Sequence, residues 1–190
     1  MNTQKKLNLG CGEDKKEGYI NVDWSPLVKP DVVHDLNTIP YPFDDHSVDS
    51  IEAFHVLEHL EKPFAIMKEF HRILVPGGQL HLKLPHFSRG FTHAEHTHGF
   101  DVTFPLYFNP SFSKSGYYGV PFRLCSLRLS WLAFFHLLPY MGYGKITIRL
   151  LRGINAAISV LGNISPAFTS RVWCFWVGGF DEIEFIFKKN

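Results

Sequence analysis

Two glycines and an acid near the start of the chain are the residues best suited to hold a ligand. Gly10-Cys11-Gly12 follows an apolar run at residues 6–9, and Asp23 ends the next apolar run at residues 19–23. A strand that enters Gly-x-Gly at the carboxyl edge of a sheet lets the backbone approach a ligand closely. A carboxylate at the end of the next strand can accept hydrogen bonds from both hydroxyls of a ribose. This pattern predicts a cofactor that contains a nucleoside.

The residues after Gly12 argue against a dinucleotide. The dinucleotide fingerprint has a third glycine that opens a helix, and Lys15 stands at that position. Six residues, from Glu13 to Gly18, separate Gly12 from the next predicted strand. A whole crossover usually needs at least about 10–12 residues, so no full helix is expected to offer its N-terminus to a pyrophosphate. A cofactor with a ribose and no phosphate fits better.

The first half of the chain alternates between strand and helix patterns. We expect strands at residues 6–9, 19–23, 31–35, 47–54 and 79–84, and an amphipathic helix over residues 60–74. Pro63 suits the first turn of that helix and Pro76-Gly77-Gly78 suits its end. This order predicts an α/β fold with a doubly wound, mainly parallel sheet, helices on both faces and a shortened first crossover.

The second half is less regular. Residues 86–145 are rich in aromatic residues and histidine, and we expect them to form an insertion after the fifth strand that serves as a lid or substrate region. Residues 146–151 suggest another strand, residues 153–161 a short helix, and residues 180–188 a final strand. With 190 residues and no linker, residues 1–190 are expected to form one domain.

The ordered set of motifs over residues 6–86 resembles the class I S-adenosylmethionine-dependent methyltransferases. It is similar to the small branch often associated with polysaccharide and cell-envelope biosynthesis. The matching segments are Leu-Asn-Leu-Gly-Cys-Gly at 7–12, Asn-Val-Asp at 21–23, His-Asp-Leu at 34–36, Pro-Phe-Asp at 42–44, His-Val-Leu-Glu-His-Leu at 55–60, Arg-Ile-Leu-Val-Pro-Gly-Gly at 72–78 and Leu-Pro-His at 84–86.

The resemblance implies a Rossmann-like methyltransferase fold, an antiparallel last strand and S-adenosyl-L-methionine as the cofactor. It implies that Gly10, Cys11 and Gly12 approach the methionine end and that Asp23 takes the ribose hydroxyls. It also places Asp35 and Leu36 beside the adenine and His55 near the sulfonium. The family often has an acid where Asn8 stands; Asn8 can still donate a hydrogen bond there, without charge.

A group of histidines follows the fifth predicted strand. His86, His93, His96 and His98 lie close to Glu95 and Asp101, at the edge where substrate should meet the cofactor. Three interpretations stay open: a general base that deprotonates the acceptor, a metal site and an exposed polar loop. We favour the base, with His98 and His86 as the catalytic candidates, and expect no metal.

His55-Val56-Leu57-Glu58-His59 also matches the inverted zinc-protease pattern. That chemistry requires the motif to lie within one helix, whereas here it spans the end of a strand and the start of a helix. We therefore disfavour a metalloprotease.

The composition limits which binding partners and which cellular compartment are expected. The net charge of +1 gives no field that would attract nucleic acid. Three cysteines without paired spacing and an N-terminus without an apolar signal region predict a reduced, cytoplasmic protein. The uncharged aromatic tract at residues 131–138 favours a lid or core, and also suits weak contact with a membrane or a lipid-linked substrate.

The sequence therefore predicts an enzyme that moves a methyl group from S-adenosylmethionine to an oxygen or nitrogen of a small or glycan-like acceptor. The alternative is a methyltransferase-like module that binds cofactor or a partner without catalysis. A nicotinamide-dependent oxidoreductase is disfavoured by the missing third glycine.

Overall fold

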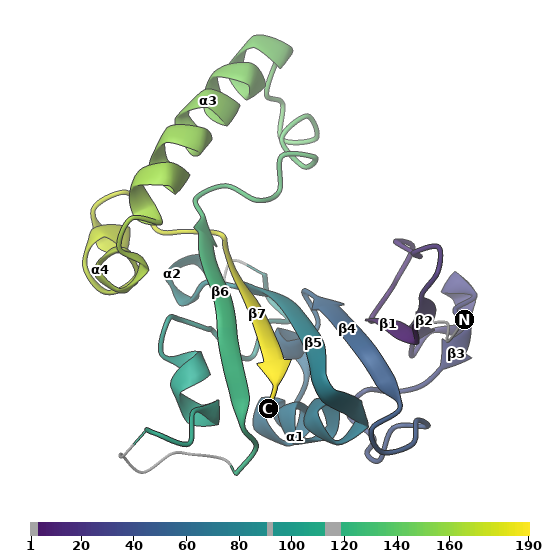
Figure 1. Cartoon of the computed structure of the whole chain (residues 1–190). Helices are drawn as coiled ribbons and strands as arrows, with labels where there is room; N and C mark the ends of the chain where they lie inside the picture. Colours follow the sequence, from purple (N-terminus) through teal and green to yellow (C-terminus); the bar gives the residue numbers. More distant parts are fainter. Residues whose placement is uncertain (1–3, 91–92, 113–118) are drawn as a thin grey trace.

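The fold is a seven-stranded sheet, seen in a computed structural model that describes residues 4–90, 93–112 and 119–190. The strands run in the order β3-β2-β1-β4-β5-β7-β6 (Figure 1). Pairs from β3 to β5 are parallel, and β7 is antiparallel to both β5 and β6. The strands are β1 (Lys6–Leu9), β2 (Ile20–Asp23), β3 (Val32–Val33), β4 (Val48–Phe54), β5 (Leu74–Pro85), β6 (Phe122–Ser130) and β7 (Glu182–Lys189). The predicted α/β class with a mainly parallel sheet is confirmed.

The strand order reverses between β1 and β4. The chain builds β1, β2 and β3 outward in one direction and then returns to place β4 on the other side of β1. In open α/β sheets a crevice forms at such a reversal, outside the carboxyl ends of the strands. Any ligand site of this fold is therefore expected beyond Leu9 and Phe54, where β1 and β4 end.

One face of the central sheet is completely buried. Leu80, Leu82 and Leu84 of β5 alternate inward, together with Phe185 and Phe187 of β7. Helix α1 (Pro63–Ile73) covers this face, and the 3₁₀ helix η3 (Phe104–Phe108) extends the cover. The alternation expected at residues 79–84 is confirmed, because period-two apolar spacing places every second side chain in the core.

The opposite face is half-exposed and polar. His81 Nε2 lies 2.7 Å from Glu184 Oε1 across β5 and β7, and Lys16 Nζ lies 2.6 Å from Glu52 Oε2. Residues 10–19 contain no helix, as the shortened first crossover predicted. The expectation of helices on both faces is not met over these central strands, because the connections that would supply the second layer are too short.

Two elements of the second half differ from expectation. Residues 145–162 form one long helix, α3 (Lys145–Gly162), so the predicted strand at 146–151 is wrong and the predicted helix at 153–161 is only its second half. Residues 122–130, inside the predicted insertion, form β6 and belong to the sheet. The short helices α2 (Phe87–Gly90) and α4 (Pro166–Arg171) complete this half. Residues 91–92 and 113–118 of the predicted insertion lie outside the described residues.

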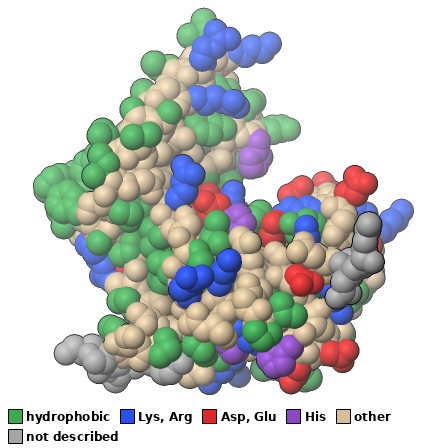
Figure 2. All heavy atoms as spheres, in the orientation of Figure 1, with side chains coloured by type: hydrophobic (Ala, Val, Ile, Leu, Met, Phe, Trp, Pro, Cys, Tyr) green, Lys and Arg blue, Asp and Glu red, His purple; other side chains and the backbone are tan. Residues whose placement is uncertain are grey.

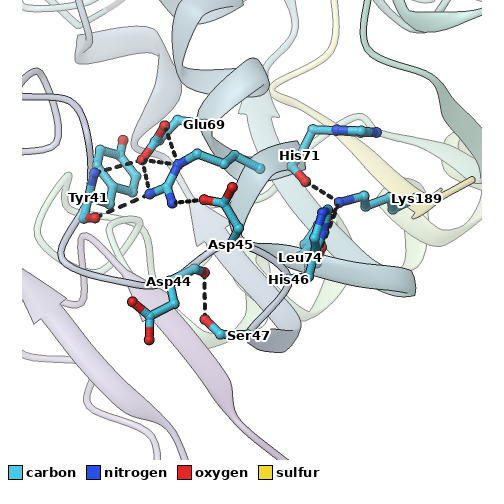
Figure 3. A network of polar contacts seen from close by, with 10 residues as sticks. Tyr41, Asp44, Asp45, His46, Ser47, Glu69, His71, Leu74 and Lys189 are labelled. Atoms are coloured by element: carbon cyan, nitrogen blue, oxygen red, sulfur yellow. Dashed lines mark hydrogen bonds and ion pairs between the residues drawn. The ribbon is translucent and has the colours of Figure 1, made fainter.

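A polar network fixes the edge of the sheet where β4 and β5 begin (Figure 3). The Lys189 ammonium donates to the carbonyl oxygens of His71, at 2.6 Å, and Leu74, at 2.7 Å. Arg72 pairs with Glu69 and Asp45 on the same edge. These contacts anchor the end of β7 to α1 and leave the carboxyl edge of the sheet for a ligand.

No helix in the described ranges combines the length and the apolar character needed to cross a membrane.

Candidate functional site

The turn after β1 packs tightly against the turn after β4. Gly10 has φ +64°, and a Cβ atom built on it would lie 2.3 Å from Cγ2 of Val56. An alanine there would require both strain in the left-handed region and movement of Val56. The glycine therefore allows the two loops to meet at the point where the strand order reverses.

Asp23 is held in a fixed orientation at the end of β2. Its Oδ2 accepts the backbone N–H of Gly12 at 2.8 Å, and its Oδ1 accepts the N–H of Ser25 at 2.9 Å. Each carboxylate oxygen has a second acceptor position that these bonds do not use. The side chain is almost buried, yet it lines the cavity at this edge. It is therefore positioned to accept further hydrogen bonds from a ligand.

The cavity has a volume of about 510 Å³, within the range of small-molecule sites. Among the residues that the sequence assigned to the cofactor, it is lined by Gly10, Asp23, Asp35, Leu36 and His55. Residues from β1, β2, β4 and the segment after β3 thus converge on one site, as the strand-end positions predicted.

Three other predicted cofactor residues, Asn8, Cys11 and Gly12, do not line this cavity. Asn8 is buried, and its amide nitrogen donates to the carbonyl oxygen of Asp14 at 2.9 Å and to Asn21 Oδ1 at 3.0 Å. These bonds close the loop between β1 and β2. Burial and the nearby Asp23 raise the pKa of the Cys11 thiol, so it stays protonated. In this geometry Asn8 and Cys11 support the loop that presents Gly10 and Asp23.

His55 lies between two carboxylates. It follows β4 with φ +55°, its Nε2 lies 3.0 Å from Glu182 Oε2, and its Nδ1 lies 3.5 Å from Glu58 Oε1. Glu182 reaches this edge because β7 is antiparallel and starts there. Burial lowers the pKa of His55, but the hydrogen bond to Glu182 and the negative charge of the nearby Glu58 outweigh this effect and raise the pKa to about 9. The imidazole is therefore a cation at neutral pH.

His98 lies on the segment that follows α2, close to this edge. Thr97 donates its hydroxyl proton to the carbonyl oxygen of Glu58 at 2.9 Å, and His98 Nδ1 lies 2.8 Å from the same hydroxyl oxygen. Since the hydroxyl has only one proton, His98 Nδ1 is the donor to it, and Nε2 of a neutral ring keeps its lone pair. His98 lines a separate hollow of about 280 Å³ beside Phe64 and Tyr107.

His86, the other candidate base, is in the interior. Its side chain is fully buried, with Nδ1 2.7 Å from Ser88 Oγ and Nε2 2.8 Å from Ser170 Oγ. Burial lowers the pKa of His86 to about 4, with smaller opposing effects of Asp101 and Arg171. Both ring nitrogens are occupied and the residue does not line the cavity. The geometry does not support the prediction that His86 faces the acceptor, because the side chain joins β5 to α4.

His93 and His96 lie beside His59, a residue that the sequence analysis did not include in their group. The ring centroids of His59 and His96 are 4.8 Å apart, and those of His93 and His96 are 4.9 Å apart. Thus His59 of the 3₁₀ helix η2 (Leu57–His59) joins His93 and His96. The motif at residues 55–59 spans a strand end and this 3₁₀ helix, which agrees with rejecting the metalloprotease pattern.

Sequence reasoning missed several residues that line the cavity. Three of them, Trp24, Asn37 and Val56, are next to residues that it did assign, so adjacency to a strand end was the signal for these three. The missed residues are Trp24, Asn37, Val56, His59, Leu60 and Glu95.

Residues 12–82, less than half of the chain, match the family described as a methyltransferase domain. No curated protein matches. A SAM-dependent methyltransferase from Archaeoglobus fulgidus is 19% identical, with a TM-score of 0.55 over 99% of this chain and 87% of that one.

Other solved structures share the fold at lower identity. An S-adenosylmethionine-dependent methyltransferase from Mesorhizobium loti is 11% identical, with a TM-score of 0.52 over 98% of this chain and 91% of its own. The [4+2]-cyclase SpnF is 12% identical, with a TM-score of 0.55 over 98% of this chain and 75% of its own. Two more local matches cover only 46% and 29% of the other chains.

Residues 12–82 thus match a methyltransferase domain, and the solved structures show that the chain has the fold of S-adenosylmethionine-dependent methyltransferases. The residues at the cavity fit S-adenosylmethionine as the cofactor: the volume is suitable, the backbone of Gly10 is accessible, and the Asp23 carboxylate has unused acceptor positions.

Proposed function

We propose that the protein transfers a methyl group from S-adenosylmethionine to an oxygen or nitrogen of a small or glycan-like acceptor. The observation that carries the proposal is the convergence of Gly10, Asp23, Asp35, Leu36 and His55 on one cavity where the strand order reverses. In this assignment Asp23 binds the ribose hydroxyls, Asp35 and Leu36 border the adenine, and Gly10 approaches the methionine end. Asn8, Cys11 and Gly12 support that loop.

The cofactor supplies an electrophilic methyl group on a sulfonium. A lone pair of the acceptor forms the new bond to carbon while the carbon–sulfur bond breaks, and the acceptor loses one proton. Alignment of the acceptor with that bond is the main contribution of the protein. We assign His98 Nε2 as the atom that accepts this proton, because the Nδ1–H of the same ring donates a hydrogen bond to Thr97.

The fold alone does not determine the reaction. The match to SpnF, a cyclase by its description, means that this fold also serves reactions other than methyl transfer. A binding module without transfer is the corresponding alternative for this chain. Mass spectrometry separates the two, since only a transferase leaves a candidate acceptor one methyl group heavier.

The cofactor assignment is tested by calorimetry with S-adenosylhomocysteine and with NAD. We expect S-adenosylhomocysteine to bind and NAD to give no heat. Asp23→Ala should weaken binding by about 1.5–3 kcal/mol, the value of hydrogen bonds to a charged group. Asp23→Asn, which keeps the size of the side chain, should give an intermediate loss.

Asp14→Ala is the matched control, because Asp14 is an exposed acid in the same loop. Thermal unfolding of each variant verifies that the loop is intact. Unchanged affinity in a folded Asp23→Ala protein would move the ribose site elsewhere, and NAD binding without any response to S-adenosylhomocysteine would overturn the assignment.

The proposal also includes a cytoplasmic location with peripheral contact to a membrane. The sequence placed this contact at residues 131–138, but these side chains are mostly half-buried: the Trp131 indole donates to the carbonyl oxygen of Val177, and the Phe134 ring lies against His55. A lipid contact would therefore have to use a surface other than residues 131–138.

A further inference from the structure

Residues 131–180 form an arm whose helix α3 stands away from the sheet (Figure 1). The base of the arm is fixed: Asp181 accepts the N–H of Ala133 at 3.1 Å and pairs with Arg89 of α2. Helix α3 runs along the arm, and α4 lies at the end near the sheet. The arm is therefore a defined projection and not a loose extension.

Helix α3 has an apolar stripe on the side that the protein does not cover. Its inner side is used by Asn155, which accepts the N–H of Leu132, and by Ile158 and Gly162. The outer stripe has the spacing of successive helical turns, and its members Ile146, Leu150, Ile154 and Leu161 are exposed. A globular helix normally turns such a stripe toward a core. This one faces outward.

Exposed apolar side chains continue beyond α3. Hydrophobic side chains gather along the arm and over its α4 end in Figure 2. Trp176 is 73% exposed and Phe175 is 67% exposed. Further exposed members are Tyr140, Met141, Ile164 and Phe168. An apolar surface this large on a monomer marks a binding surface.

The charge of the same region is one-sided. All 18 acidic residues of the chain lie at or before Asp101 or at or after Asp181. Between these two positions the sequence has seven cations, and Lys145, Arg149, Arg152 and Arg171 belong to the arm. Arg149 lies next to the apolar stripe, in one shallow hollow with Ile146, Leu150 and Ile154. Arg171 is paired with Asp101, whereas Lys145, Arg149 and Arg152 have no acid within ion-pair distance among the described residues. The surface therefore combines apolar side chains with positive charge along α3.

We propose that the arm binds the surface of an anionic lipid bilayer. Apolar and aromatic side chains enter the boundary between head groups and acyl chains, and flanking cations attract anionic head groups. Tyr and Trp suit that boundary because their rings are apolar with a polar edge. A symmetric contact between two arms would place cations against cations with no acid between them, so charge favours lipid over a second copy.

The position of the arm gives this surface a role in the proposed reaction. Phe134, at the base of the arm, lies 5.1 Å from His55, which lines the cofactor cavity. An acceptor with a lipid part would then reach the cavity from the bilayer. This role rests on the proposed methyl transfer, whereas lipid binding does not.

Co-sedimentation of the full chain with vesicles tests the proposal. We expect pelleting with phosphatidylglycerol–phosphatidylcholine vesicles, little with pure phosphatidylcholine, and weaker binding as salt rises. The double variant Ile146→Ser, Leu150→Ser should bind at least about tenfold more weakly. Arg149→Gln with Arg152→Gln should lose most of the preference for anionic vesicles.

Leu27→Ser is the matched control, because Leu27 is 88% exposed on the body and Ile146 is 87% exposed on the arm. Binding of S-adenosylhomocysteine should be unchanged in the arm variants, which verifies folding and separates this test from that of the transfer reaction. Wild-type protein that stays in the supernatant with anionic vesicles would overturn the proposal. So would undiminished pelleting of the serine variant, or an arm-dependent dimer without lipid binding.

A second inference rests on a different observation, the Glu58 carboxylate. This side chain is fully buried, and neither of its oxygens has a hydrogen-bond partner among the described residues. The nearest imidazole nitrogens are His55 Nδ1 at 3.5 Å and His96 Nε2 at 3.9 Å. The His55 imidazolium compensates this buried charge only in part, because it makes no hydrogen bond to the carboxylate, and a second cation beside Glu58 would lower the remaining cost.

Glu58, His59 and His96 each offer one ligand atom, and these atoms lie within 4.8 Å of one another. Two imidazoles and a carboxylate are a ligand set typical of zinc. Thr97 already holds the segment against η2, because both its N–H and its hydroxyl donate to the Glu58 carbonyl oxygen. We infer that a divalent ion of the zinc type binds here and ties this segment to η2 beside the cavity.

Calorimetry with Zn²⁺ on chelator-treated protein tests the site, and Co²⁺ absorption reports its geometry. We expect one ion per chain, tetrahedral Co²⁺ bands, and a loss of affinity of about 100-fold or more in His96→Ala and Glu58→Gln. His98→Ala, two residues away, should bind Zn²⁺ like the wild type. Two results would overturn the inference: no Zn²⁺ binding by the wild type, or the same Zn²⁺ affinity in the wild type, His96→Ala and Glu58→Gln. The Glu58 charge would then be compensated by histidine alone.

Discussion

His98 and His86 are the same residue type in opposite environments, and the difference decides which can act on a substrate. His86 has both ring nitrogens against serine hydroxyls in the interior. His98 is only half-buried, and its Nδ1 is oriented by Thr97. A general base needs one nitrogen fixed and the other accessible. His98 meets that requirement.

Removal of the His98 imidazole should therefore affect turnover but not cofactor binding. We expect His98→Ala to lower kcat by about 10²–10⁴, the usual contribution of general acid–base catalysis. Thr97→Val, which removes the orienting hydroxyl, should give a smaller loss. Activity with an identified acceptor measures kcat, and calorimetry with S-adenosylhomocysteine measures affinity.

His93→Ala is the control for general disturbance of the segment, since His93 is exposed five residues away. Wild-type turnover in His98→Ala would mean that positioning alone carries the reaction.

At the scale of elements, His86 is the joint between the end of β5 and helix α4. It contacts Ser88 of α2 on one side and Ser170 of α4 on the other, and its ring packs near Phe180 before β7. A neutral ring satisfies both serines without the cost of a buried charge. The joint therefore depends on the protonation state of one side chain.

This joint predicts how stability changes with pH. The pKa of His86 is about 4 in the folded protein and 6.5 ordinarily, so the unfolded chain takes up a proton first as pH falls. The neutral His86 ring contributes about 3 kcal/mol to the free energy of unfolding. This contribution is complete above pH 6.5 and is lost as the pH falls toward 4. Urea unfolding at pH 7 and pH 5 should show part of this loss in the wild type.

His86→Gln should be less stable at pH 7 and show a flatter pH profile. His136→Gln, on an exposed residue of the arm, should keep the wild-type profile. Equal slopes for the wild type and His86→Gln would contradict this account.

The sequence was most informative where secondary structure repeats with an undisturbed period. Strands β1, β2, β3, β4 and β7 and helix α1 were predicted, and so was β5 over residues 79–84, whereas residues 74–78 belong to β5 and not to a turn that ends the helix. β6 was missed because its register shifts between Leu124 and Ser126, so its apolar residues do not keep a spacing of two. α3 was divided because its outer stripe is apolar, which resembles a buried strand over a short window.

The part of the candidate site that could be predicted from the sequence consists of residues at or just after strand ends. Position after a strand identified Gly10, Asp23 and His55, since the edge of a parallel sheet gathers such residues. The pairing of Asn8 with Asn21 and the burial of His86 depend on neighbours that are distant in sequence. Those contacts could not be inferred from local spacing.

At the scale of the whole molecule, charge is divided between two regions. The acids lie in the body with the cavity, and the region between Asp101 and Asp181 has only cations. The overall charge of +1 hides this division. A net charge near zero therefore says little about the partners of a chain whose charges are segregated.

The place of β7 in the sheet has a consequence for biosynthesis. β7 is the last strand in sequence, yet it lies between β5 and β6. Until the ribosome has added residues 182–189, β5 has a bare edge and β6 has no partner within the sheet. Phe122, whose ring packs against Phe187, and Leu129, which pairs with Ile183, are then without these partners, and unpaired strands are prone to aggregate. The chain is therefore most prone to aggregate in the interval before β7 can pair with β5 and β6.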